Sequence, residues 1–126
     1  MATYSATTEV NQTLVANTVD TVTITSTPDG DIRIINQTGT NPIYVTLGTI
    51  STSFAQGQHG VEVPVTTTVQ PPVPTIGGAN EIEVPAVAGA SIELDVGVNG
   101  AIVSLISAGA MAYSVMDSST IDEINP

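Results

Sequence analysis

The chain has 126 residues, of which 41% are hydrophobic and 3% aromatic, and its formal net charge is −11. This length suits one domain with its own core. Twelve acidic residues against a single Lys or Arg argue against binding to nucleic acid or to anionic lipids, because both need cations on the protein. The lack of cysteine excludes disulfides and thiolate metal sites.

The N-terminal residues 1–18 are polar, rich in Thr and Asn, and weakly patterned. They predict an arm that is loosely ordered alone or lies on a neighbouring molecule. Apolar and polar residues then alternate from Val22, and the alternation resumes at Ile32 after the turn sequence 27–30. A turn rich in Pro, Asp and Gly between two alternating runs predicts a β-hairpin.

The middle of the chain is less regular. Alternation over 43–47 predicts a strand, and the Ser-, Thr-, Gln- and Gly-rich residues 49–60 predict a loop that carries His59. Valines alternate next at 61, 63 and 65, with Pro64 between them. Proline donates no ladder hydrogen bond, so we expect an edge strand here.

The C-terminal third has the strongest pattern. Alternation predicts strands over 82–84 and 92–98, and Asn99-Gly100 is the preferred pair for a two-residue type I′ turn. Residues 101–106 are apolar on both faces, which is typical of a buried central strand or an interface strand. A last strand is expected over 111–115.

These patterns together predict about eight short strands with regular turn signals, which favours an all-β fold. We expect an antiparallel β-sandwich of jelly-roll-like form over residues 19–116, between the arm 1–18 and an acidic tail at 117–126. A helix over 101–112 is the main alternative, and the Ser, Gly and β-branched residues within it argue against it.

Groups suited to catalysis are scarce. A Ser-His-Asp triad would have to use His59, the single histidine, and the chain contains no G-x-S-x-G motif. An ordinary polar role in a loop is the simpler interpretation of His59. We therefore expect no enzymatic activity, no catalytic residue and no cofactor.

Carboxylates are the remaining chemical resource. Glu81 and Glu83 share one strand face, and so do Glu93 and Asp95. If the two strands pair, the four carboxylates would lie close together and repel each other. Calcium or a basic surface on a partner protein would then be needed to neutralise them. The alternative is a solvated outer face with the acids out of register. The one cation, Arg33, is expected to pair with an acid across a strand or a subunit boundary.

Several segments resemble small β-sandwich proteins of tailed-bacteriophage particles, especially head decoration or cement proteins. In one, a strand ends in Asn, a small polar loop follows, and the next strand opens with Pro-Ile-Tyr-Val. In another, a Val-Pro-Ala turn precedes an Ile-Glu-Leu strand, and an apolar run closes the sheet. The resemblance extends over roughly residues 20–116, and the segments that carry it are 32–45, 82–85, 88–94, 101–108 and 112–115.

This resemblance implies a structural virion protein, made in the host cytoplasm, that binds the outer capsid surface and stabilises the head. Its partners would be the major capsid protein and further copies of itself, as trimers at local threefold positions. The arm 1–18 would lie across the shell or a sister subunit. Two alternatives stay open: a tail fibre or baseplate component, and a calcium- or carbohydrate-binding β-sandwich module with Glu81, Glu83, Glu93 and Asp95 as ligands.

Overall fold

The computed structural model of the chain describes residues 2–57 and 60–118, and its elements in these ranges are eleven β-strands. The strands are β1 (Ala2–Ala6), β2 (Glu9–Thr13), β3 (Asp20–Ile24), β4 (Asp31–Asn36), β5 (Ile43–Leu47), β6 (Thr49–Gln56), β7 (Glu62–Val69), β8 (Ile82–Val84), β9 (Ala90–Asp95), β10 (Ala101–Ile106) and β11 (Ala112–Asp117).

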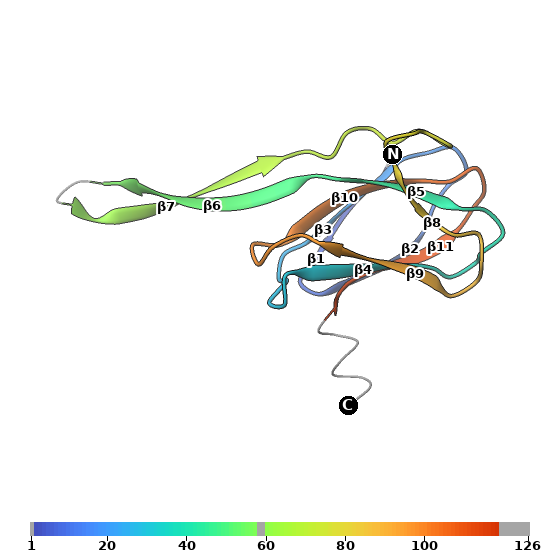
Figure 1. Cartoon of the computed structure of the whole chain (residues 1–126), viewed down its shortest axis with the longest axis horizontal. Helices are drawn as coiled ribbons and strands as arrows, with labels where there is room; N and C mark the ends of the chain where they lie inside the picture. The colour runs from blue at the N-terminus through green and yellow to red at the C-terminus, as the bar shows by residue number, and fades with distance from the viewer. Residues whose placement is uncertain (1, 58–59, 119–126) are drawn as a thin grey trace, which may run out of the picture.

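Nine of these strands form two sheets that face each other across a common core (Figure 1). One sheet has five strands in the order β1-β3-β10-β5-β8, and the other has four in the order β2-β11-β4-β9. Neighbouring strands are antiparallel except for β1 and β3, which run parallel. The predicted all-β sandwich is confirmed.

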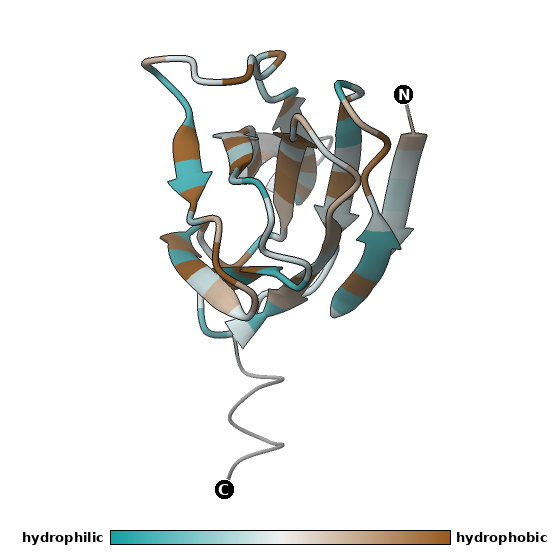
Figure 2. Cartoon of the chain, turned by 90° about the vertical axis from the view of Figure 1, so that its right-hand side faces the viewer, coloured by the Kyte–Doolittle hydropathy of each residue, from teal (hydrophilic) through white to brown (hydrophobic). Residues whose placement is uncertain are grey.

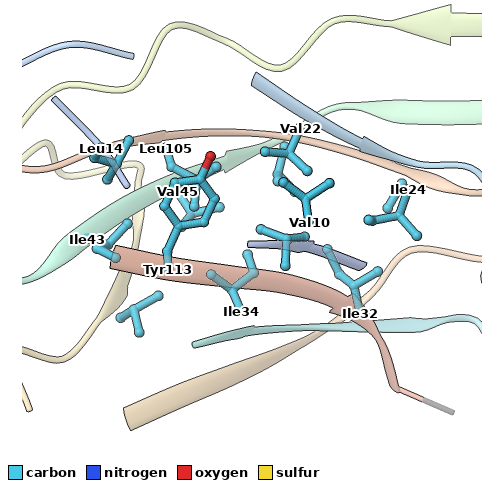
Figure 3. Close-up of a cluster of buried hydrophobic side chains, with 14 of the residues drawn as sticks. Val10, Leu14, Val22, Ile24, Ile32, Ile34, Ile43, Val45, Leu105 and Tyr113 are labelled. Atoms are coloured by element: carbon cyan, nitrogen blue, oxygen red, sulfur yellow. The ribbon is translucent and has the colours of Figure 1, made fainter. Parts of the chain in front are cut away.

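The core forms because aliphatic side chains alternate with polar ones along the strands, so that one face of each sheet is apolar. Bands of opposite hydropathy follow one another along several strands in Figure 2. Val22 and Ile24 of β3 meet Ile32 and Ile34 of β4 from the opposite sheet, and all four are fully buried. Figure 3 shows these side chains in one layer with the ring of Tyr113, between the two sheets.

Strand β10 is the central strand of the five-stranded sheet, and its six residues are all buried, as predicted for 101–106. Val103 and Leu105 belong to the core cluster, while Ile102 and Ile106 point to the other face of the sheet and are still less than 10% exposed. A strand that is buried on both faces has a nearly continuous apolar sequence, because neither face needs polar side chains for contact with water.

Successive strands cross from one sheet to the other, which corrects two turn predictions. The expected hairpin over 22–34 does not form, because β3 and β4 belong to opposite sheets. Asn99-Gly100 likewise joins strands of opposite sheets, and only Gly100 has a positive φ, of 103°, whereas a type I′ turn needs two. Local turn chemistry marks where the chain bends, and burial of the apolar face decides which sheet it enters.

Buried Thr27 holds these two crossings together. Its hydroxyl Oγ1 donates to the carbonyl of Gly97 at 2.7 Å and accepts from the amide of Gly100 at 3.0 Å. The segment after β3 and the segment before β10 are thereby fixed to each other at one end of the sandwich.

The prediction of a separate N-terminal arm is also wrong, because this part of the chain belongs to the sandwich. Residues 2–13 form β1 and β2, of which β1 pairs with β3 and β2 pairs with β11. Val10 and Leu14 are buried in the core, and Tyr4 packs against it. Few apolar residues are needed to hold these two strands on the sandwich. Each strand also forms backbone hydrogen bonds with the edge of a sheet, which contribute to its attachment.

The predicted acidic tail begins with Asp117, which is instead the last residue of β11 and is buried. It pairs with Ile32, and its amide donates to the carbonyl of Thr8 at 2.8 Å. Of the predicted tail, residues 119–126 lie outside the described residues.

The predicted loop at 49–60 is the largest departure from expectation. Residues 49–56 form β6, which pairs with β7 over its full length as a separate two-stranded sheet. We call β6 and β7 the projecting ribbon. It extends well beyond the sandwich in Figure 1, as a continuation of β5 past Gly48.

Candidate functional site: the projecting ribbon

The projecting ribbon exposes apolar side chains that a folded chain normally buries. Every residue of β7 is exposed. Phe54 of β6 is 65% exposed, and Val63, Val65 and Val69 of β7 are 48%, 42% and 57% exposed. Apolar groups gathered on an extension of the fold mark an interaction surface.

The register of the ribbon sorts these side chains onto two faces. Phe54 lies opposite Pro64 and Ile50 lies opposite Thr68, so these pairs share one face. The other face carries Val65 opposite Ser53, and it also carries Val63 and Val69 of β7. Both faces of the ribbon are therefore partly apolar.

A two-stranded ribbon gains little stability from itself. Isolated hairpins are marginal in water, and three or more strands or a packing partner are needed for independent stability. The chain nevertheless spends eight residues on each strand of the ribbon. This arrangement gains burial only when another surface covers the ribbon.

The ribbon carries little of the charge of this acidic chain. Between Thr49 and Val69 the sequence has one acidic residue, Glu62, while the whole chain has a net charge of −11. Low charge lowers the electrostatic cost of bringing this surface against another acidic molecule.

The root of the ribbon is fixed to the sandwich. Gly48 donates its amide to the carbonyl of Ile102 at 2.8 Å, and Thr46 donates its hydroxyl to the carbonyl of Pro72. A Cβ placed on Gly48 would clash with the carbonyl oxygen of Val69 and would lie 2.8 Å from the nitrogen of Pro71. The incoming and outgoing strands thus pass each other so closely that only glycine fits, and this contact sets the direction in which the ribbon leaves.

The acids singled out in the sequence are not brought together. Glu83 belongs to β8 of the five-stranded sheet and Glu81 directly precedes that strand, whereas Glu93 and Asp95 belong to β9 of the four-stranded sheet. The premise that these strands pair is wrong. Among residues 2–57 and 60–118, no group of three or more His, Asp or Glu side chains is arranged to hold a metal ion.

Arg33 pairs with an acid across neighbouring strands, as predicted. Its guanidinium Nη2 donates to the Glu93 carboxylate at 3.0 Å, and Nη1 donates to the Ser91 hydroxyl at 2.9 Å. Arg33 and Glu93 are direct partners in the β4–β9 register. This ion pair lies within one chain rather than across a subunit boundary.

Two register pairs along, on the same face, these two strands place like charges opposite each other. Asp31 faces Asp95 in the register. Desolvation raises the pKa of the Asp31 carboxyl above its ordinary value, and the charges of Glu93, Asp95 and Asp29 raise it further. Asp31, Glu93 and Asp95 therefore form a small patch of like charges on the outer face of the four-stranded sheet.

His59, the one candidate for acid–base chemistry, lies outside the described residues. The edge strand predicted at the valines 61, 63 and 65 is confirmed as β7. Its partner β6 was missed because that strand is rich in Ser and Thr. A usable signal was present: Ile50, Thr52 and Phe54 alternate with small polar residues, which is a strand pattern.

Comparison with known proteins finds no matching family model, no matching curated protein and no matching solved structure. Within the part of the chain that the structure describes, no helix is both long and apolar enough to cross a bilayer.

Proposed function

We propose that this chain is a structural protein of a tailed-bacteriophage particle, which binds the outer surface of the capsid and stabilises the head without catalysing a reaction. The resemblance of residues 20–116 to head decoration proteins supports this proposal, and so does the all-β sandwich. Its partners would be the major capsid protein and further copies of itself, with a trimer as the expected assembly.

The observation that carries the proposal is the projecting ribbon. It presents Phe54 and the valines of β7 at a distance from the core, on a segment with one acidic residue. Burial of apolar surface contributes about 25 cal/mol per Å². Contacts of this kind suit a permanent interface in an assembly better than a transient encounter.

Co-sedimentation with purified empty heads tests the proposal. We expect the full chain to bind assembled heads to a fixed saturating ratio, and to bind free capsid subunits weakly. A variant with residues 51–67 replaced by Asn-Gly would join Ile50 to Thr68, which are register partners, by a two-residue turn. This variant keeps the sandwich and should lose most head binding.

Arg33→Gln serves as the matched control, because it changes an ion pair on the sandwich and leaves the ribbon intact. It should bind heads like the full chain. Failure of the unmodified chain to bind heads would overturn the proposal, as would equal binding by the shortened variant. Image reconstruction of labelled particles separates the head location from a tail fibre or baseplate location.

A further inference from the structure

The edges of the three sheets differ in how they are protected against pairing with another chain. Natural edge strands discourage such pairing with charged residues, proline or very short length. Four of the six edge strands have one of these features: Glu9 in β2, Pro64 in β7, Glu83 in the three-residue β8, and Glu93 with Asp95 in β9. The two remaining edges, β1 and β6, have none.

From this we infer that β6 of one copy of the chain adds to the free edge of β1 in a second copy, so that the ribbon extends the five-stranded sheet of its neighbour. The inference rests on the proposed role of the ribbon as an interaction surface and names its occupant. Strand addition of this type supplies main-chain hydrogen bonds as well as side-chain packing.

The side-chain patterns of the two strands match. In β1, Thr3 and Ser5 are exposed, while Tyr4 and Ala6 pack against the core. In β6, Ser51 and Ser53 lie on one face, and Ile50 and Phe54 lie on the other. When β6 pairs with β1 so that Ser51 and Ser53 lie on the same face as Thr3 and Ser5, the hydroxyl-rich outer face continues from one strand to the other. The same pairing places Phe54 on the side of Tyr4.

Charge favours the same partner. The outer face beside the β1 edge includes Ile102 and the hydroxyl residues Thr3, Ser5, Thr21, Thr23 and Ser104, of which Thr21 and Ser104 are hydrogen-bonded at 3.0 Å. None of these residues is charged. Two copies that each carry −11 repel least where neutral surfaces meet, since charges separated by more than about 10 Å are largely screened at 0.1 M salt.

Analytical ultracentrifugation of the full chain gives the first test, with a matched pair of variants. Thr52 of β6 and Thr66 of β7 are register partners on the same ribbon face. Thr52→Glu puts a charge on the free edge, and Thr66→Glu puts the same charge on the strand that already contains Pro64. We expect Thr52→Glu to weaken self-association at least tenfold, and Thr66→Glu less than threefold. Both positions are exposed, and circular dichroism confirms that each variant folds.

Crosslinking gives the second test, because the chain has no cysteine of its own. A chain with Ser5→Cys is mixed with a larger, tagged chain with Ser51→Cys, and a short bismaleimide is added. The expected result is a mixed crosslinked dimer, which is absent when Thr67→Cys, the partner of Ser51 on β7, replaces it.

Three outcomes would overturn the inference: a monomer at all concentrations up to millimolar, equal weakening by both Glu variants, or crosslinks from β6 only to β6. Each of these results leaves head binding by the full chain unaffected, so the two proposals fail separately.

Discussion

The hydroxyl of Tyr113 donates a hydrogen bond to the carboxylate Oδ2 of Asp20 at 3.0 Å, and it joins the two sheets through the core. Asp20 opens β3 and is 3% exposed, while Tyr113 lies in β11 and is 1% exposed. Burial raises the pKa of Asp20, and burial together with the charge of Asp20 raises the pKa of Tyr113. A carboxyl group inside an aliphatic core is tolerated because it has this donor.

Tyr113→Phe keeps the ring and removes the donor. We expect the free energy of unfolding at pH 7 to fall by about 1–3 kcal/mol, since a buried acceptor loses a partner. Urea unfolding measures the change. Tyr44→Phe, at a half-buried position on the outer side of β5, is the control and should change stability by less than about 0.5 kcal/mol. Equal effects of the two variants would contradict a special role for the Tyr113 hydroxyl.

Stability should depend on pH through Asp20. Its folded pKa is higher than the ordinary value of 3.8, so the folded chain binds more protons than the unfolded chain between the two values. The contribution of Asp20 to stability is therefore present below pH 3.8 and is lost as pH rises through the raised pKa. Asp20→Asn should flatten this part of the curve of unfolding free energy against pH. A curve that keeps its slope in the variant would show that other groups cause it.

Asp95→Asn should stabilise the fold, in contrast to Tyr113→Phe, because Asp31 and Asp95 are like charges in register. Asp95→Asn removes a like charge directly opposite Asp31, so the pKa of Asp31 should fall and the midpoint of urea unfolding should rise. Titration by NMR of the Asp31 carboxyl measures the first effect. Glu62→Gln, on the ribbon, removes an equal charge elsewhere and should leave the pKa of Asp31 where it is.

Loss of the single cation should matter little to stability. Arg33 and Glu93 are 33% and 47% exposed, and partly exposed ion pairs contribute about 0–1 kcal/mol. We expect Arg33→Gln to lower the free energy of unfolding by less than about 1 kcal/mol, with a smaller difference at high salt. A loss several times larger would mean that the guanidinium holds β4 and β9 together by more than this pair.

Gly48→Ala should disturb the root of the ribbon. Its Cβ would meet backbone atoms of Val69 and Pro71, which cannot move aside like the end of a flexible side chain. Overpacking of this kind costs about 1–3 kcal/mol. Hydrogen exchange should show loss of protection at β6 and β7 with little change at β10. At Gly97, φ is 77° and a Cβ meets nothing within 4 Å, so Gly97→Ala introduces backbone strain without overpacking and should leave the protection of β6 and β7 unchanged.

Much of the sandwich could be predicted, because the alternation of apolar and polar residues is a property of each strand's own sequence. The buried faces of β3, β4 and β10 follow directly from Val22, Ile34 and Val103. The pairing of Arg33 with an acid could also be predicted, since no other cation competes for the acids. The candidate site was predicted only in part: the valines of β7 indicated an edge strand, whereas the Ser- and Thr-rich β6 has a weaker strand signal because its apolar residues are few.

Sequence alone determined that this protein would be an aliphatic, acidic β-fold with few groups suited to catalysis, because composition and period act residue by residue. Tertiary structure alone decided that Asn99-Gly100 crosses between sheets, that residues 2–13 complete both sheets, and that residues 49–69 leave the body as a ribbon. The reason is physical. Pairing partners are chosen by burial and by free sheet edges, and both of these exist only once distant parts of the chain have met.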